Sequence, residues 1–218
     1  MCKIMTKRGY KKVSASVLTR EEIFDYLSKR KIIIEPILDE KQINCASVDL
    51  RLDNYFGEFR TARLPHIDPA NISDEYHEYL DFVELEFFRD FYYLQPKRFV
   101  LAKTFEYIVL PNDIVGRLDG RSSVAREGLT VHAVAGHVDP GFKGHLVFEL
   151  LNAGEMPIKL YPLMRVAKIL FYRCRETRGY GGQYNIQIDI RPPKNDPELE
   201  CIKKYNEEKY RQQNHQTL

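Results

Sequence analysis

DGRSSVAREGLTVHAVAGHVDPGFKGHLVFELLN, residues 119–152, is the stretch that decides the fold. It opens on a turn-forming Asp-Gly pair and closes on an apolar strand that carries one carboxylate, Glu149. The six residues after this pair contain two cations and two hydroxyls, Arg121, Ser122, Ser123 and Arg126, and a second turn, Asp139–Pro140–Gly141, precedes the strand. A cationic segment, a tight loop and a strand-borne carboxylate together indicate a nucleotide-phosphate site with an acid–base group attached.

Outside this stretch, residues 91–173 consist of short apolar segments separated by turn residues. The turn residues recur at near-regular spacing, which is typical of an all-β barrel or sandwich. Strands alternating with long helices are not seen, and this argues against a dinucleotide-binding or P-loop architecture. The expected strands are FYYLQP (91–96), RFVLAKTFEYIVLP (98–111), DIVGRLD (113–119), LTVHAVA (129–135), GHLVFELLN (144–152), MPIKLYP (156–162) and RVAKILFYR (165–173).

The N-terminal part of the chain predicts one short helix and two strands. Thr19 and Glu22 form a capping box, in which the threonine hydroxyl accepts a backbone amide and the glutamate reaches back, so a helix should occupy 21–30. Residues 32–35 read as a short strand. Residues 47–52 alternate apolar and polar side chains, which predicts a half-buried strand.

The length of 218 residues suits one full-sized core and is too short for two. We therefore expect a single barrel domain at 18–174, preceded by a basic extension at 1–17 and followed by a C-terminal extension and tail at 175–218. The polar composition after residue 174 predicts a segment that is mobile or that packs on a neighbouring subunit.

Composition limits the functional classes. Thirty-three Lys and Arg against 31 Asp and Glu leave a formal charge of +2, so phosphate binding must be local and a nucleic-acid partner is not expected. No apolar run is long enough to span a bilayer, so no membrane partner is expected. The four cysteines stand far apart, which indicates a reducing cytoplasm and provides no zinc site.

Five blocks of the sequence carry a family resemblance. They are GRSSVAREGLTVH (120–132), HVDPGFKG (137–144), FELLN (148–152), ASVDLRL (46–52) and KYRQQ (209–213). On these blocks the chain resembles the deoxycytidine triphosphate (dCTP) deaminase branch of the superfamily shared with trimeric deoxyuridine triphosphatases (dUTPases). The resemblance implies a distorted, jelly-roll-like β-barrel that assembles as a homotrimer with sites shared between subunits.

The resemblance gives Glu149 the role of activating the water that attacks C4 of cytosine. A carboxylate enclosed by a barrel or subunit contact loses hydration, which favours its protonated form and suits it to proton transfer. A solvated strand glutamate is the alternative. Arg121, Ser122 and Ser123 would hold phosphates, while Ser122 and Arg126 would position the base and the water. If 122–126 is one helical turn, Ser122 and Arg126 share a face; the alternative is a helix cap with two solvated arginines.

The loop at Asp139 and Phe142 should be a type II turn. By resemblance Asp139 reads the deoxyribose hydroxyl, and the Phe142 ring crowds a ribose 2′ oxygen. The resemblance implies further substrate contacts at Ala135, Val147, Tyr205, Lys209 and Gln213, the last two on a tail that closes over the nucleotide.

The sequence thus predicts hydrolytic deamination of dCTP to dUTP and ammonia, without a catalytic metal. Mg²⁺ would enter only with the substrate triphosphate. Ala135–Gly136 is closer to branches that go on to dUMP and diphosphate, and this second step stays open. A dUTP diphosphatase is the nearest alternative, against which Ser123 and Glu149 argue. A non-catalytic nucleotide-binding trimer is another, and dUTP and dTTP are further candidate ligands.

Overall fold

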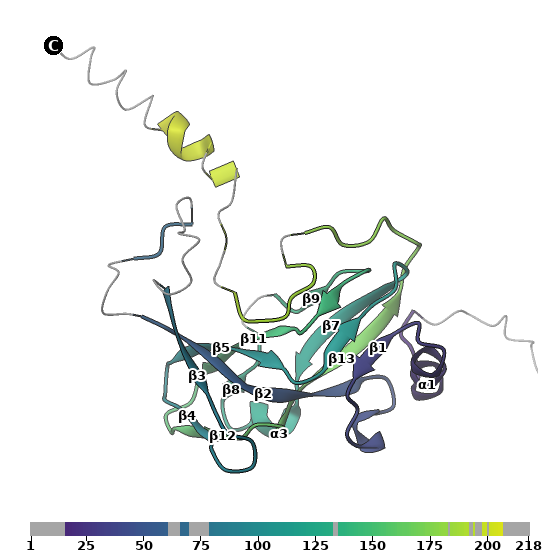
Figure 1. Ribbon diagram of the computed structural model, residues 1–218, viewed down its shortest axis with the longest axis horizontal. Coiled ribbons are helices and arrows are strands. Elements are labelled where there is room, and N and C mark those ends of the chain that lie inside the picture. The colour runs from purple at the N-terminus through teal and green to yellow at the C-terminus, as the bar shows by residue number, and fades with distance from the viewer. Residues whose placement is uncertain are drawn as a thin grey trace, which may run out of the picture.

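The computed structural model describes residues 16–60, 66–69, 79–132, 135–182, 184–191, 194, 198–199 and 201–206. Its elements are α1 (Arg20–Ser28), β1 (Ile33–Glu35), the 3-10 helix η1 (Glu40–Gln42), β2 (Val48–Phe59), β3 (Leu80–Glu84), β4 (Tyr92–Leu94), β5 (Phe99–Thr104), β6 (Tyr107–Val109), β7 (Ile114–Gly120), α3 (Ser122–Ala125), β8 (Leu129–Thr130), β9 (His137–Val138), β10 (Lys143–Gly144), β11 (Val147–Asn152), β12 (Ile158–Leu160) and β13 (Arg165–Arg173). Residues 201–206 form a further helical turn near the C-terminal end (Figure 1). None of the helices in these ranges is long and apolar enough to cross a membrane.

The strands form one large curved sheet and two small ones. The large sheet has the order β8-β11-β5-β2-β13-β7-β9, with β3 paired to β2, while β1-β6-β10 and β12-β4 form the others. The long strand β2 joins the two halves of the large sheet, because its first half pairs with β13 and its second half with β5 and β3. The register shifts between Leu52 and Phe56, where the strand passes from one half to the other. Figure 1 shows the resulting curl, with α1 beside β1.

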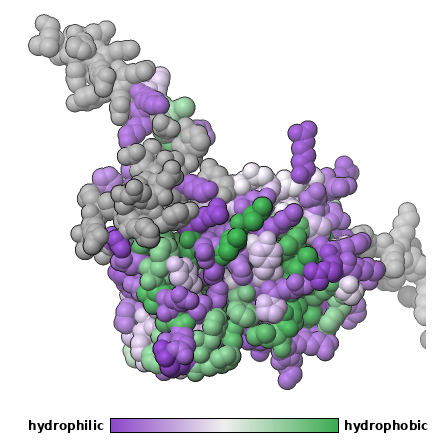
Figure 2. Space-filling model, viewed as in Figure 1, coloured by the Kyte–Doolittle hydropathy of each residue, from purple (hydrophilic) through white to green (hydrophobic). Residues whose placement is uncertain are grey.

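The core lies inside this curl. Leu50, Phe56, Phe148 and Phe171 come from three strands of the large sheet and are completely buried. At the surface, hydrophilic residues are interspersed with hydrophobic ones on the face shown in Figure 2. The prediction of a mainly β chain with one short N-terminal helix therefore agrees with the structure.

The predicted capping box is present at the start of α1. The Thr19 amide donates to Oε2 of Glu22 at 2.9 Å, and the Glu22 amide donates to the Thr19 hydroxyl at 3.4 Å. These bonds satisfy two amides that a helix leaves without partners at its first turn. Ile23 is completely buried, so the helix docks on the barrel through the expected face.

Several predicted strands are shorter or divided in the structure, and two of them illustrate the reason. The segment expected at 98–111 divides into β5 and β6, because the chain turns at 105–106 and the side chain of Glu106 is buried there. Among the described residues of the segment expected at 129–135, Leu129–Thr130 form a strand, which pairs with the end of β11. Apolar composition predicted both segments, whereas the breaks depend on contacts with distant residues.

The strand at the start of β2 is buried on both faces, and not on one as predicted. Asp49 is 3% exposed, although the alternation placed it on the solvent face. Its Oδ2 lies 3.1 Å from Nε of Arg121 and 3.3 Å from Nη1 of Arg165, and its Oδ1 accepts a bond from Asn44. Two cations and an amide thus compensate for the lost hydration of the carboxylate.

A second buried carboxylate, Glu106, lies between β5 and β6, next to β2. Its two oxygens accept bonds from the Gln42 side-chain amide at 3.0 Å and from the Arg51 backbone amide at 2.9 Å. Burial raises the pKa of Glu106 to about 7, although these hydrogen bonds and the nearby Arg51 charge act in the opposite direction. Gln42 also donates to the Asp49 carbonyl at 3.2 Å, so one amide connects both acidic positions.

Glu106 should make the stability of the fold depend on pH. The folded pKa of about 7 lies above the usual 4.5, so this carboxyl stabilises the fold below about pH 4.5 and loses that contribution as pH rises to 7. The full change is on the order of 3 kcal/mol. We expect Glu106→Gln to be less stable than the parent at pH 5, with a gap that narrows toward pH 8, in urea unfolding at fixed protein concentration. A gap independent of pH would contradict this assignment.

The segment after β13 packs on the barrel of its own chain. The Thr177 amide donates to the Asn112 carbonyl at 3.0 Å, and the Tyr180 amide donates to the Pro140 carbonyl at 2.7 Å. Asn112 lies between two glycines, since a Cβ on Gly141 or Gly179 would stand 2.8 or 2.7 Å from its Oδ1. This packing brings the start of the C-terminal extension against the Asp139 turn.

Candidate functional site

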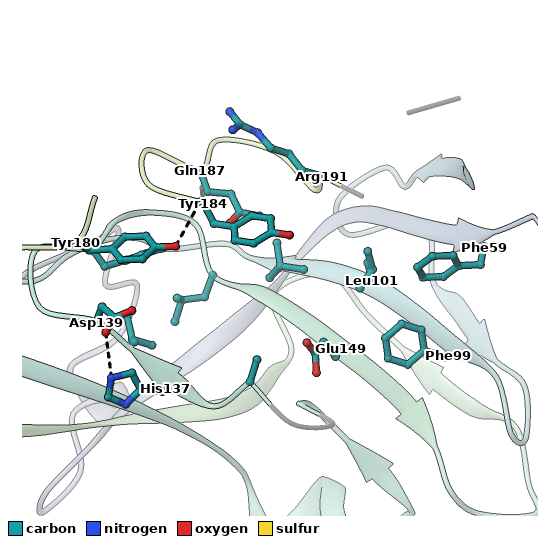
Figure 3. Close-up of a pocket in the computed structure, with 15 residues that line it drawn as sticks. Phe59, Phe99, Leu101, His137, Asp139, Glu149, Tyr180, Tyr184, Gln187 and Arg191 are labelled. Carbon is teal, nitrogen blue, oxygen red and sulfur yellow. Dashed lines mark hydrogen bonds and ion pairs between the residues drawn. The ribbon is translucent and has the colours of Figure 1, made fainter. Parts of the chain in front are cut away.

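A cavity of about 380 Å³ opens between β5, β11, the Asp139 turn and the C-terminal extension. Figure 3 shows Asp139 toward one end of it, Glu149 in the middle and the rings of Phe99 and Phe59 toward the other end. The lining contains five of the residues that the sequence predicts for the site, namely Ala135, Asp139, Phe142, Val147 and Glu149. Residues from 135 to 149 therefore meet in one concave site.

Glu149 reaches the cavity because β11 alternates as its sequence predicts. Phe148 and Leu150 point into the core and are completely buried, so Val147 and Glu149 face the opposite side. The strand is held between β5 and β8, and the Glu149 amide donates to the Val131 carbonyl at 3.1 Å. Apolar side chains from β5 line the cavity beside the carboxylate. The site thus holds the Glu149 carboxylate against a largely apolar wall.

The loop at Asp139 is the predicted type II turn. The Phe142 amide donates to the Asp139 carbonyl at 3.2 Å, and Gly141 has a φ of +81°, which the third residue of this turn requires. Asp139 Oδ1 lies 3.2 Å from Nε2 of His137, and this contact orients the carboxylate. The Phe142 ring is 7% exposed and lines the cavity beside it.

The C-terminal extension supplies cavity residues that the sequence reasoning missed. Tyr180, Tyr184, Gln187 and Arg191 all line the cavity, and Figure 3 shows them above Asp139 and Glu149. The Tyr184 amide donates to the Tyr180 hydroxyl at 3.3 Å. A signal was present, because Tyr184 and Gln187 repeat the Tyr-x-x-Gln spacing found in KYRQQ at 209–213.

The predicted phosphate clamp forms a separate cluster. Ser122 to Ala125 form α3, and the Arg126 amide donates to the Ser122 carbonyl at 3.3 Å, so the expected helical turn is present. Ser122, Ser123 and Arg126 are exposed, and the cavity lining includes none of them. Within this chain the predicted clamp and the Glu149 cavity are two distinct surfaces.

Arg121 is not a freely solvated arginine. Besides the ion pair with Asp49, its Nη1 donates to the Arg165 carbonyl at 2.9 Å. These contacts hold the guanidinium against β2 and β13 at the first residue before α3. A phosphate bound here would meet a cation whose position is already fixed.

The remaining predicted contacts lie elsewhere. Tyr205 belongs to the exposed turn 201–206 and is not among the residues that line the cavity. Lys209 and Gln213 fall outside the described residues. Their substrate contacts stay predictions. In the described ranges no group of three or more His, Cys, Asp or Glu side chains could hold a metal ion.

Comparison with known proteins supports the same family. Residues 17–174 match the family model described as dCTP deaminase-like. The chain is 43% identical over 156 residues to "dCTP deaminase, dUMP-forming" of Methanosphaera stadtmanae, covering 72% of this chain and 78% of the relative. A protein of the same name from Dictyoglomus turgidum is 45% identical over 178 residues, covering 78% and 90%.

Among solved structures, the 2′-deoxycytidine 5′-triphosphate deaminase of Agrobacterium tumefaciens superposes with a TM-score of 0.59 at 22% identity. The match covers 74% of this chain and 49% of that chain, so the present chain spans about half of its length. This likeness confirms the predicted fold. The family model and the relatives above 40% identity show that the chain belongs to the dCTP deaminase-like family.

Proposed function

We propose that the protein deaminates dCTP by hydrolysis and that Glu149 transfers the protons. The observation that carries this proposal is the position of Glu149 in the cavity, between Asp139 and an apolar wall. The names of the relatives support dCTP as the substrate, and they support a second step that gives dUMP and diphosphate.

The reaction follows from the roles of these side chains. The Glu149 carboxylate accepts a proton from water as the water oxygen bonds to C4 of cytosine. It then returns this proton to the amino group, which leaves as ammonia when the C4–N bond breaks. The second water proton moves from the C4 hydroxyl to N3, so that C4 becomes the carbonyl carbon of dUTP. Asp139 would bind the deoxyribose hydroxyl at the other end of the cavity, and the Phe142 ring would exclude a 2′-hydroxyl. Exclusion of water by the apolar wall strengthens these polar contacts.

The triphosphate needs the clamp of a second subunit. Because α3 and the cavity are separate surfaces in one chain, we infer a homotrimer in which Arg121, Ser122, Ser123 and Arg126 of one subunit complete the cavity of the next. Mg²⁺ would arrive on the phosphate oxygens and water. The clamp itself offers guanidinium and hydroxyl groups, which suit phosphate and do not hold Mg²⁺. The expected cytoplasmic location stays a prediction.

A shared site predicts complementation between inactive variants. In trimers assembled at random from equal amounts of Glu149→Gln and Arg126→Ala chains, a site is intact when it takes its clamp from the first and its carboxylate from the second. Each choice has a probability of one half, so about a quarter of the parent ammonia release should return. The measurement compares co-expressed chains with each variant alone. Activity no higher than that of the separate variants would show that each site belongs to one chain.

A dUTP diphosphatase is the second candidate, because Asp139 could orient water toward phosphorus in the same cavity. Incubation with dCTP or dUTP and Mg²⁺ distinguishes the two when ammonia, dUTP, dUMP and diphosphate are followed. Ammonia from dCTP establishes deamination. Diphosphate from dUTP without ammonia from dCTP would replace the proposal by the diphosphatase.

A further inference from the structure

The C-terminal extension crosses the cavity as a short strap, defined here as residues 184–191. Two of its side chains are buried against the barrel, since Gln187 and Ile190 are 6% and 3% exposed, whereas Ile186 and Ile188 are 57% and 59% exposed. Two of the strap residues that line the cavity, Tyr184 and Gln187, contact it from above (Figure 3). The position of the strap therefore decides whether the cavity is covered or open to solvent.

The backbone of the strap is joined to the end of β10. The His145 amide donates to the Gln187 carbonyl at 2.7 Å, and the Gln187 amide donates to the Lys143 carbonyl at 3.2 Å. Gly144 allows this approach, since a Cβ there would stand 2.5 Å from the Gln187 carbonyl oxygen. The Gly144 φ of +139° is a second reason for glycine at this position.

Lys103 fastens the strap from the barrel side. It lies on β5 directly opposite Val147, a residue of the cavity wall. Its ammonium group donates to Oδ1 of Asp189 at 2.8 Å and to the Ile188 carbonyl at 3.3 Å. It also lies 3.7 Å from Oδ2 of Asp53 on β2.

The two carboxylates beside Lys103 differ in exposure. The side chains of Lys103 and Asp53 are both 13% exposed, whereas that of Asp189 is 66% exposed. If the strap lifts, Lys103 keeps Asp53 as a partner and is not left as an unpaired, largely buried charge. Asp189 returns to water. The contact is therefore reversible, unlike a pair in which both charges are buried.

Ile190 provides the apolar half of the same attachment. It packs in a small cluster with Tyr79, Leu80 and Leu101. Leu101 also lines the cavity, so the strap and the cavity wall share one apolar contact surface. Lifting the strap would expose Ile190 to water, which opposes opening.

We propose that Lys103, Asp189 and Ile190 form a latch that holds the strap over the bound substrate. Lys103 is a positioning residue, because it acts through Tyr184 and Gln187 and does not line the cavity itself. The latch sets the affinity for substrate and the rate at which product leaves. Its effect on catalysis rests on the proposed dCTP deamination, whereas closure of the strap is a property of the protein without substrate.

The test removes one charge of the latch. Asp189→Asn should raise backbone amide hydrogen exchange in residues 184–191 of the substrate-free protein by about two- to fivefold, the range for an exposed ion pair. KM for dCTP should rise by the same factor and kcat should not fall. Asp25→Asn is the matched control, since it removes an exposed pair with Lys29 on α1. Asp189→Glu keeps the charge and should restore parent exchange.

Two results would overturn the latch. The first is that Asp189→Asn leaves backbone amide hydrogen exchange in residues 184–191 at the rate of the parent protein. The second is that Asp189→Asn increases exchange in the Lys103→Met protein as much as it does in the parent. Once Lys103 has lost its charge, replacing Asp189 should have no further effect. Failure of the proposed function gives a different result. The parent protein would then release no ammonia from dCTP, while Asp189→Asn would still increase hydrogen exchange in residues 184–191.

Discussion

Replacing Glu149 with Gln is expected to lower the rate of ammonia release from dCTP by a factor of about 10²–10⁴. The amide has nearly the same shape and still lines the cavity, but it cannot accept a proton from the attacking water. Binding of dCTP should change little, since neither the clamp nor the Asp139 turn is altered. A coupled ammonia assay measures the rate, and equilibrium binding of dCTP measures the affinity.

The control for this variant is Glu155→Gln. The Glu155 side chain is 85% exposed and pairs with Lys97 at 3.0 Å on the turn before β12. It undergoes the same chemical change outside the cavity, so its rate should match that of the parent. If Glu149→Gln releases ammonia as fast as the parent, Glu149 is not the group that transfers protons.

Gly144→Ala should displace the strap. The added Cβ would stand 2.5 Å from the Gln187 carbonyl oxygen and 2.6 Å from its nitrogen, and the residue would be held at a φ of +139°. These backbone atoms of Gln187 cannot move aside as a flexible side chain could. We expect KM for dCTP to rise by about tenfold or more, because the main-chain contacts of the strap are lost together with Tyr184 and Gln187.

Gly181→Ala separates this effect from a general cost of alanine. Gly181 stands just before the strap, and a Cβ there meets nothing within 4 Å. The Gly181→Ala variant should have the same hydrogen exchange and the same KM for dCTP as the parent. The Gly144→Ala variant should show fast hydrogen exchange throughout residues 184–191. A Gly144→Ala protein with parent exchange and parent KM would mean that the strap does not need its contact with β10.

Local patterns predicted the parts of this fold that depend on neighbours in sequence. The capping box of Thr19 and Glu22 predicted α1, and alternation in β11 predicted the face on which Glu149 lies. The Pro140–Gly141 pair predicted the turn after Asp139. Each of these depends on hydrogen bonds or side-chain direction within a few residues, which the sequence specifies directly.

Long-range contacts explain what the sequence did not predict. Asp49 alternates as a solvent-facing residue and becomes buried only because Arg121 and Arg165 reach it from other elements. The strap carries isoleucine at positions 186, 188 and 190, but of these three only Ile190 is buried. Its place on the barrel depends on a glycine about 40 residues upstream, Gly144. Proximity in sequence also misled, since Arg126 and Glu149 belong to separate surfaces of one subunit.

The attachment of the C-terminal extension at two points limits how the chain can change in length. Asn112 and Pro140 hold its beginning, and Gly144 holds Gln187 further along. An insertion or deletion between residues 180 and 187 would move every later strap residue out of register with the barrel. Extra residues placed after the exposed turn at 201–206 would leave both attachment points where they are. A reporter or affinity domain fused to this protein therefore belongs downstream of that turn.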